Sequence, residues 1–420
     1  MPSSARMSAA ELRASVSLSS IFALRMLGMF LILPVFAIHA EQLPGGGNLT
    51  LVGIAIGAYG LTQALLQIPF GWWSDRYGRK PVICVGLAIF AVGSFVAALA
   101  DNLYVVILGR VLQGAGAVSA AVIAMVADLT REDQRHKAMA MIGSTIGATF
   151  AVSLAGGPWL NALIGVPGIF ALTGILAAAA IGVMLWLVPG VAESAPGPAP
   201  QWREVLTHSE LARLNFGVLV LHVVLMSLFI AVPFALRGGG LEVNAHWKVY
   251  LPTLAGSFLL LAPVVIGART GPRLKYAFVG SVALLLAVHA ALPWAAAAGV
   301  WQVAIALLAF FAAFNVLEAL MPALATRLAP AGAKGLAIGI FTSTQFAGAF
   351  IGAAAGGWAY GSWGIAGTVT LNGVLITLWL AVALGMKVPA AAGTRVYATR
   401  APDSQQANGL ASPPVDSRGA

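Results

Sequence analysis

The chain alternates between long apolar runs and short polar turns. A run of roughly 20 apolar residues is long enough to cross ~30 Å of hydrocarbon as a helix. Twelve such runs occur, at 18–40, 50–73, 81–100, 102–127, 137–160, 165–188, 214–236, 247–268, 274–292, 300–326, 335–358 and 364–386. Each run is about twice as long as a barrel strand needs, and lipid cannot satisfy an open strand edge. The pattern therefore predicts an all-α membrane protein with twelve transmembrane helices.

The composition agrees with a membrane protein. Hydrophobic residues make up 60% of the 420 residues, compared with about 45–50% in soluble domains. In a soluble chain, a net charge of +9 would suggest a nucleic-acid partner. Here the basic residues lie in short turns between apolar runs, which excludes nucleic acid and indicates a lipid bilayer. The single cysteine, Cys84, lies inside a run, so no intrachain disulfide or cysteine metal site is expected.

The distribution of basic residues predicts the orientation. If the N-terminus is inside, 19 of the 23 lysine and arginine residues fall on the inner side. Positive charge accumulates on the cytoplasmic side of membrane proteins. We therefore expect a multi-pass protein of a bacterial inner membrane with both termini in the cytoplasm. The first run is too long for a signal peptide and is interpreted as a retained span.

The two halves of the chain repeat. Lys137 to Trp159 is similar to Lys334 to Trp358, and the period is roughly 200 residues. Chance similarity between helices rich in alanine and glycine is the alternative. The repeat predicts two pseudo-symmetric six-helix bundles. The expected segments are a cytoplasmic N-terminal segment (1–17), the N-terminal bundle (18–188), a cytoplasmic linker (189–213), the C-terminal bundle (214–386) and a disordered cytoplasmic tail (387–420).

The turn between the second and third runs is unusually charged. It reads Gly-Trp-Trp-Ser-Asp-Arg-Tyr-Gly-Arg-Lys from position 71 to position 80. Its glycines suit close approach or a positive φ, and its charges must stay in water or headgroups. The residues that form the pattern are Gly71, Asp75, Arg76, Gly78, Arg79 and Lys80. A plain basic turn on the cytoplasmic side is the alternative interpretation.

This turn resembles the signature loop of the major facilitator superfamily of secondary transporters. The resemblance implies a substrate site near the midplane between two parallel halves. It also implies that Asp75 faces the start of the eleventh span and that Arg79 pairs with Asp128 at the end of the fourth. These three residues would form an inner latch, intact when the cavity opens outward. A solvated charge cluster is the alternative.

Four ionisable residues lie inside apolar runs, where their cost makes them functional candidates. Arg25, Arg110, His222 and Glu318 lie in spans one, four, seven and ten, and the resemblance implies that these four helices line the central cavity. Glu318 is interpreted as a proton-binding or substrate-cation group, with Asn315 one turn away on the same face. The alternatives are an ion pair between Glu318 and an arginine across the cavity, snorkelling of Arg25 and a structural hydrogen bond of His222.

The fifth span resembles the motif that marks exporters in the superfamily. The matching residues are Gly147, Gly156, Gly157 and Pro158, which permit close helix contact and a bend. Trp159 replaces the glycine that usually follows the proline. The match to the exporter motif is therefore partial.

Similarity over both halves identifies the chain as resembling the YajR-type drug:proton antiporters, a subgroup of the superfamily. The resemblance implies proton-coupled efflux of amphipathic small molecules by alternating access, with no cofactor, no metal and a monomeric protein. No phosphate-binding glycine loop or nucleophile constellation occurs, so an enzyme is not expected. The alternatives are a transporter of a specific, anionic metabolite, and a non-transporting membrane sensor on the same fold.

Overall fold

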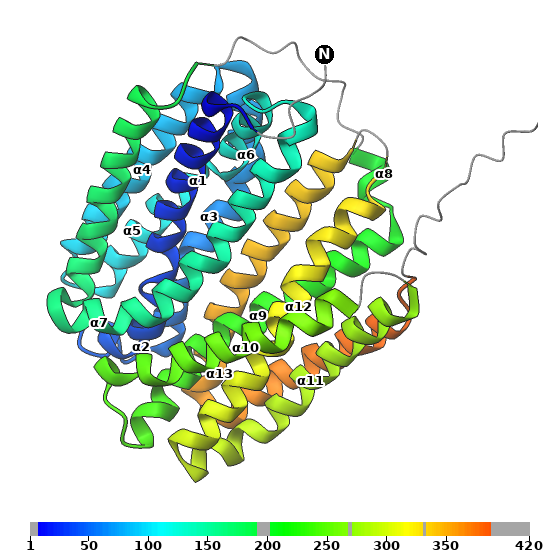
Figure 1. The fold of residues 1–420 in the computed structure, drawn as a ribbon. Coiled ribbons are helices and arrows are strands. Elements are labelled where there is room, and N and C mark those ends of the chain that lie inside the picture. The colour runs from blue at the N-terminus through cyan, green and yellow to red at the C-terminus, as the bar shows by residue number, and fades with distance from the viewer. Residues whose placement is uncertain (1–6, 191–201, 268–270, 331–332, 388–420) are drawn as a thin grey trace, which may run out of the picture.

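The computed structural model describes residues 7–190, 202–267, 271–330 and 333–387, and within them the secondary structure is helical (Figure 1). The helices are α1 (Ala9–Phe30), α2 (Leu33–Ala40), α3 (Leu49–Arg76), α4 (Arg79–Ala98), α5 (Leu103–Ala115), α6 (Ser119–Asp128), α7 (Glu132–Trp186), α8 (Trp202–Leu206), α9 (Ser209–Gly238), the 3-10 turn η1 (Val243–Ala245), α10 (Trp247–Gly267), α11 (Gly271–Ala298), α12 (Val300–Leu328) and α13 (Lys334–Leu384).

Ten helical segments of the described chain are long and apolar enough to cross a membrane, and two of them are double-length. A straight helix with the 55 residues of α7 would extend about 80 Å, far beyond a bilayer. The chain instead turns at Gly165, which has φ 67°. The 51-residue α13 turns at Gly364, with φ 60°, which is 199 residues later (364 − 165). Counting both halves of α7 and α13 gives the twelve predicted spans.

Two spans are broken near their middle. The first span divides into α1 and α2 just before Pro34, whose ring cannot continue an unbroken helix. The fourth span divides into α5 and α6 around Gly116. A Cβ on Gly116 would overlap the carbonyl oxygen of Gly86 on α4, so the break lies where two backbones touch. It also allows the Gly116 carbonyl to accept a bond from Arg25.

The first helix begins nine residues before its apolar run. Ser8 accepts a hydrogen bond from the Glu11 amide at 3.2 Å, and Glu11 accepts one from the Ser8 amide at 2.8 Å. This reciprocal capping box satisfies backbone donors at the start of a helix. The helix therefore extends into the segment 1–17, which hydropathy alone placed outside the membrane.

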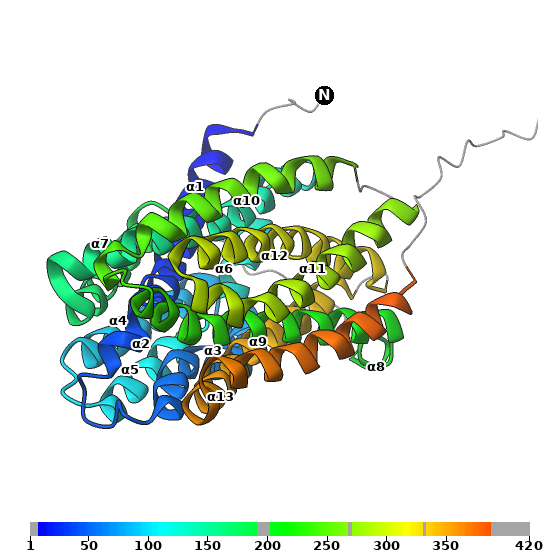
Figure 2. The same ribbon diagram turned by 90° about the horizontal axis from the view of Figure 1, so that it is seen from below.

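The helices form two bundles. Elements α1 to α7 make one bundle, coloured blue to green, and α8 to α13 make the other, coloured green to orange (Figures 1 and 2). We call the end that carries the start of α1 and the turn at Gly78 the proximal end. The opposite end, with the turns at Gly165 and Gly364, is the distal end. The predicted all-α fold of two six-helix bundles is confirmed.

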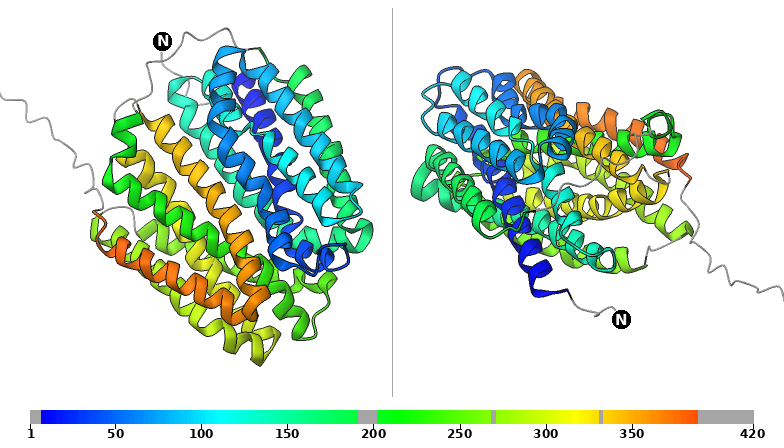
Figure 3. Two further views of the ribbon diagram at one scale, coloured as in Figure 1. Left: turned by 180° about the vertical axis from the view of Figure 1, so that it is seen from behind. Right: turned by 90° about the horizontal axis from the view of Figure 1, so that it is seen from above.

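The bundles meet along α3 and α13, which run side by side in the view from behind (Figure 3). Near the distal end and the middle, the backbone of α13 touches Gly53, Gly57 and Gly60, so closely that a Cβ at any of them would overlap it. Towards the proximal end, a Cβ at Gly335 or Gly339 would meet nothing within 4 Å. The two helices therefore diverge from the distal end to the proximal end.

An aromatic contact joins the bundles at mid-height. The Phe150 ring of α7 lies 6.3 Å from Phe229, 6.1 Å from Phe311 and 6.4 Å from Phe314, all in the C-terminal bundle.

Two of the predicted segments lie wholly or partly outside the described residues. The tail after Lys387 lies outside the described residues, and the linker 189–213 is described only up to residue 190 and again from residue 202.

Candidate functional site

The signature loop brings together the charged residues that were expected to meet. Gly78 has φ 89°, which reverses the chain between α3 and α4. Arg79 then donates to Asp128 Oδ2 at 2.9 Å and to Ser74 Oγ at 2.8 Å, and it pairs with Asp75. The predicted trio of Asp75, Arg79 and Asp128 therefore forms one cluster inside the N-terminal bundle.

The rest of the loop packs against its own bundle. Lys80 Nζ donates to the carbonyl oxygens of Leu185 at 3.1 Å and Val188 at 2.7 Å, which lie at the end of α7. Arg76 lies over the Trp72 ring, 5.6 Å from its centre. The Asp75 side chain is 61% exposed. Among the described residues its partner is Arg79, so the expected contact with the start of α13 is not made in this arrangement.

The two arginines in the spans of the N-terminal bundle are buried and surrounded by neutral partners. Arg25 of α1 donates to the Gly116 carbonyl at 3.2 Å and also contacts Ser119 and Gln63. Gln63 in turn donates to Gln67. The alternative interpretation, in which Arg25 snorkels towards the membrane surface, is therefore not observed, because its guanidinium is held inside the bundle.

Arg110 of α5 ties three helices together. It donates to Gln113 Oε1 at 2.8 Å, to the Ile56 carbonyl of α3 at 3.2 Å and to the Gly28 carbonyl of α1 at 3.4 Å. Its Nε atom is buried without a partner in the described structure. The described partners of Arg110 include no carboxylate, which is unusual for a buried cation.

Both guanidiniums lie close to one tyrosine ring. Arg25 lies 5.6 Å and Arg110 5.0 Å from the centre of the Tyr59 ring, within cation–π range. A small cavity at the bundle interface lies beside Tyr59 and Arg110. It is lined by Met29, Ile56, Tyr59 and Arg110 from one bundle and by Met226 and Ala349 from the other. The predicted candidates Arg25 and Arg110 thus belong to one positively charged site that borders the C-terminal bundle.

The C-terminal bundle holds the opposite charge. Gln345 of α13 donates to His222 Nε2 of α9 at 2.8 Å and to Glu318 Oε1 of α12 at 3.0 Å. The His222 and Glu318 side chains approach to 3.9 Å. His222 is almost fully buried, whereas the Glu318 side chain is 31% exposed. Gln345 therefore joins an imidazole and a carboxylate that come from two other helices. The described partners of Glu318 include no arginine, so the alternative of an ion pair with an arginine is not observed.

Asn315 does not join this cluster, contrary to the expectation that it shares a face with Glu318. Its amide donates to Ser257 Oγ of α10 at 2.8 Å. Three residues along a helix turn the side chain by about 300°, leaving a difference of about 60°. This difference is enough for the two residues to face different neighbours. Asn315 therefore connects two helices of its own bundle.

The exporter-type residues differ in their surroundings. A Cβ on Gly157 would overlap the Leu31 carbonyl of the first span, so only glycine fits there. A Cβ on Gly147 or Gly156 would meet nothing within 4 Å. Pro158 lies inside α7. Close helix contact therefore explains one of the three glycines in the motif.

Sequence reasoning did not identify the polar contacts between the bundles at the distal end. Arg237, in the last turn of α9, donates to both carboxylate oxygens of Glu41, at 2.5 and 3.1 Å. Asn161 of α7 donates to Asn244 of η1 at 3.0 Å. Each contact joins one bundle to the other, so the distal end is closed. Arg237 had a sequence signal as one of the few basic residues away from the proximal side, but its partner did not.

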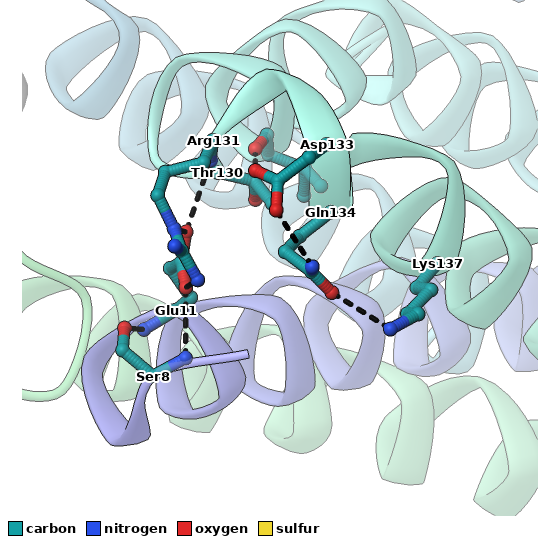
Figure 4. Close-up of polar contacts among 8 residues, drawn as sticks. Ser8, Glu11, Thr130, Arg131, Asp133, Gln134 and Lys137 are labelled. Atoms are coloured by element: carbon teal, nitrogen blue, oxygen red, sulfur yellow. Dashed lines mark hydrogen bonds and ion pairs between the residues drawn. The ribbon is translucent and has the colours of Figure 1, made fainter. Parts of the chain in front are cut away.

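A second proximal cluster was also missed (Figure 4). The Glu11 carboxylate accepts bonds from the Arg131 backbone at 3.0 Å and from its guanidinium at 2.9 and 3.2 Å. This carboxylate raises the pKa of the Arg131 guanidinium above its usual value. Beside it, Lys137 donates to Gln134 at 2.8 Å. The cluster joins the start of α1 to the start of α7 within the N-terminal bundle.

Comparison with known proteins identifies the family. Residues 18–288 match the model of the Major Facilitator Superfamily. The chain belongs to this superfamily. It is 43% identical over 389 residues to the inner membrane transport protein YajR of Escherichia coli K12, covering 91% of this chain and 85% of the relative.

Two further similarities cover less sequence or show only the fold. The quinolone resistance protein NorA of Staphylococcus aureus N315 is 31% identical over 126 residues, covering 30% of this chain and 32% of that protein. A solved bacterial homolog of the human lysosomal transporter Spinster, inward-facing and occupied, superposes with a TM-score of 0.72 at 14% identity, covering 90% and 97%. Superfamily members are transporters, so the chain is a multi-pass membrane transport protein and not an enzyme.

Proposed function

We propose that this superfamily member is a monomeric, proton-coupled exporter of amphipathic small molecules that works by alternating access. The proposal depends most on the cluster of His222, Gln345 and Glu318. A carboxylate and an imidazole 3.9 Å apart in an apolar bundle can take up and release a proton between them. Export is supported by the partial motif around Gly157 and by the similarity to a protein named for quinolone resistance.

The proposed membrane is the bacterial inner membrane, which the name of the E. coli relative supports. We assign the proximal end to the cytoplasm because the basic turns that contain Arg79 and Arg131 lie there. With that assignment the arrangement described here is closed towards the outside. The divergence of α3 and α13 towards the proximal end is then an opening towards the cytoplasm.

The signature loop is proposed as the latch of the opposite arrangement. Rocking the bundles would bring the start of α13 against Asp75, which is exposed and whose partner among the described residues lies in its own bundle. A latch can bias two arrangements only through contacts that differ between them. Asp75 meets that condition because its partner across the interface is present in one arrangement and absent in the other.

Replacing Asp75 by asparagine tests the latch. We expect transport to fall strongly while membrane insertion is unaffected, because the arrangement closed to the cytoplasm loses its cross-bundle contact. Transport in everted vesicles measures the effect, and fluorescence-detected size exclusion measures insertion. Asp101→Asn at the exposed distal turn is the matched control. Full activity of the Asp75 variant would rule out the latch.

A specific observation supports a second candidate, transport of an anionic metabolite. The described partners of Arg25 and Arg110 are carbonyls, amides and a hydroxyl, and not carboxylates. Two buried guanidiniums beside Tyr59 create a positive field at the bundle interface. Such a field favours a negatively charged substrate group.

Proteoliposomes with an imposed pH gradient separate these candidates. A panel of amphipathic probes is used, with ethidium as a cation and carboxyfluorescein as an anion. We expect the gradient to drive the cation, and Glu318→Gln to reduce that stimulation about tenfold, as loss of a coupling free energy of 1–3 kcal/mol predicts. Exchange of the probe without a gradient should persist in the variant.

The controls and alternative results are distinct. Glu242→Gln, at an exposed distal turn, should behave as the wild type. If only anionic probes move, the second candidate replaces the first. If no probe moves under any gradient, a sensor is the better interpretation. If Glu318→Gln leaves gradient-driven transport unchanged, Glu318 is not the proton carrier.

A further inference from the structure

Gln345 makes hydrogen bonds that require its two acceptor atoms, His222 Nε2 and Glu318 Oε1, to carry no proton. The His222 Nδ1 atom lies 3.0 Å from the Val218 carbonyl oxygen. Because a carbonyl can only accept, Nδ1 carries the hydrogen and Nε2 of a neutral ring is the acceptor. Gln345 donates one N–H to that Nε2 and the other to Glu318 Oε1. Its amide therefore fits a neutral histidine and a glutamate whose Oε1 carries no proton.

A proton added to either acceptor atom conflicts with the amide. On His222 Nε2 it takes the lone pair that accepts from Gln345. On Glu318 Oε1 it adds a hydrogen where Gln345 already donates. On Glu318 Oε2 it leaves Oε1 able to accept from Gln345, because His222 Nε2 is 3.9 Å away, beyond hydrogen-bond distance. A proton on His222 Nε2 or on Glu318 Oε1 therefore removes or weakens a hydrogen bond of Gln345 and disfavours this orientation of its amide.

The next residue on α13 lies at the interface between the bundles. The carbonyl oxygen of Phe346 packs on Gly60 of α3, where a Cβ would stand only 2.8 Å from it. The Phe346 ring lies 6.4 Å from the Tyr59 ring, edge to face. A change in the Gln345 side chain therefore occurs in the turn of α13 that touches the other bundle.

Few other charged groups lie near this cluster. Across the interface are Arg25 and Arg110, beyond the Tyr59 ring. On α11 the nearest is His289, whose Nδ1 contacts the Leu285 carbonyl at 2.8 Å. The remaining described charged groups on the helices packed against α9, α12 and α13 lie towards helix ends: Asp75, Arg76, Arg203, Glu204, Glu210, Arg213, Arg237, Lys248, Arg273, Lys275, Arg327 and Lys334. The cluster is thus the main titratable site beside the middle of α13.

We propose that Gln345 is the positioning residue that transmits protonation of His222 and Glu318 to the α3–α13 contact. This inference rests on the proposed function, because it requires that the pair takes up the coupling proton. In the deprotonated state Gln345 holds α9, α12 and α13 together and seats Phe346 against Gly60. Protonation releases that hold and favours separation of the bundles at the distal end.

The experiment measures proton uptake and opening of the distal end separately. The full-length protein in lipid nanodiscs, with Cys84→Ala, carries spin labels at Leu99→Cys and Trp301→Cys. These positions lie at the distal ends of the two bundles and are 85% and 80% exposed. Distances between the two spin labels report opening of the distal end across a pH series. The infrared band of the protonated Glu318 carboxyl reports proton uptake, and it is assigned by its loss in Glu318→Gln. The variant is Gln345→Met, which keeps the shape of the side chain but cannot donate.

The two labels should show one distance when the distal end is closed and a longer one when it is open. In the wild type we expect the ratio of the open population to the closed population to change at least about tenfold across the pH series. In Gln345→Met the carboxyl band should still titrate, while the ratio of the open to the closed population becomes independent of pH. Thr344→Val, the isosteric change one residue earlier, should behave as the wild type, because Thr344 bonds only within its helix.

The other outcomes separate this inference from the proposed function. If Glu318→Gln abolishes the pH response but Gln345→Met keeps it, Gln345 does not transmit protonation and the proton site still stands. If Glu318→Gln responds to pH like the wild type, both the proposed proton site and this inference fail. If the carboxyl band stops titrating in Gln345→Met, the amide sets the proton affinity and is not the transmitting group.

Discussion

Replacing Gly53 by leucine is expected to abolish transport by preventing closure of the distal end. A Cβ at this position would overlap the Ala353 carbonyl oxygen, and the other atoms around it are also backbone atoms of α13. Backbone cannot move aside as a flexible side chain can. Overpacking of this kind costs about 1–3 kcal/mol or more. The same free energy shifts a two-state equilibrium about 5- to 150-fold.

The cross-bundle contacts at the distal end cannot compensate for that cost. The side chains of Arg237 and Glu41 are 44% and 38% exposed, and exposed ion pairs contribute about 0–1 kcal/mol. Distal spin labels should therefore show the open distance in Gly53→Leu at every pH. Gly280→Leu is the matched control, because a side chain there meets nothing. If Gly53→Leu transports normally, the close approach of α3 and α13 is not needed for the cycle.

The number of spans and the two-bundle fold could be predicted because both depend on properties that are local in sequence. A run of roughly 20 apolar residues becomes a span wherever it lies. The turns at Gly165 and Gly364 repeat after the period found in the sequence. The start of α1 was harder to place, because the capping box of Ser8 and Glu11 extends the helix into polar sequence.

The partners of the predicted residues could not be found in this way. Glu318 and His222 attract attention because charge in an apolar run is costly, whereas a glutamine such as Gln345 costs less and looks ordinary. Its two contacts span 123 and 27 residues of sequence, and no local spacing encodes them. Asn315 was placed with Glu318 from spacing alone, and the remaining rotation turned it to α10 instead.

The predicted latch illustrates a different limit. The family resemblance implied that Asp75, Arg79 and Asp128 lie together, and these residues do form a cluster. The proposed contact of Asp75 with α13 would belong to another arrangement of the bundles. Residues that contact each other in only one arrangement are visible in sequence only through a family pattern.

Replacing Arg110 by leucine is expected to abolish transport without lowering thermal stability. Arg110 is a fully buried cation whose described partners include no carboxylate. Removing a charge from water costs several kcal/mol, while each hydrogen bond to a charged group returns about 1.5–3 kcal/mol. Replacing a buried ion pair by apolar groups of similar volume is often neutral or stabilising, and we expect a similar balance for Arg110, whose burial no described carboxylate offsets. We expect the melting temperature of Arg110→Leu in detergent to equal or exceed that of the wild type.

Arg110→Lys separates charge from geometry. Lysine keeps the positive charge but lacks the planar fork with which Arg110 reaches the carbonyls of Gly28 and Ile56 on two other helices. It therefore retains the cost of burial and loses the bonds that offset it, so Arg110→Lys should melt below both the wild type and Arg110→Leu. Arg203→Lys on the exposed face of α8 is the matched control. If Arg110→Leu melts well below the wild type while Arg110→Lys retains transport, the guanidinium serves to hold the helices together. If Arg110→Leu melts at or above the wild type and neither variant transports, this bundle carries a buried charge at a cost to its stability. Such a cost is expected only if the charge acts on the substrate or on the proton.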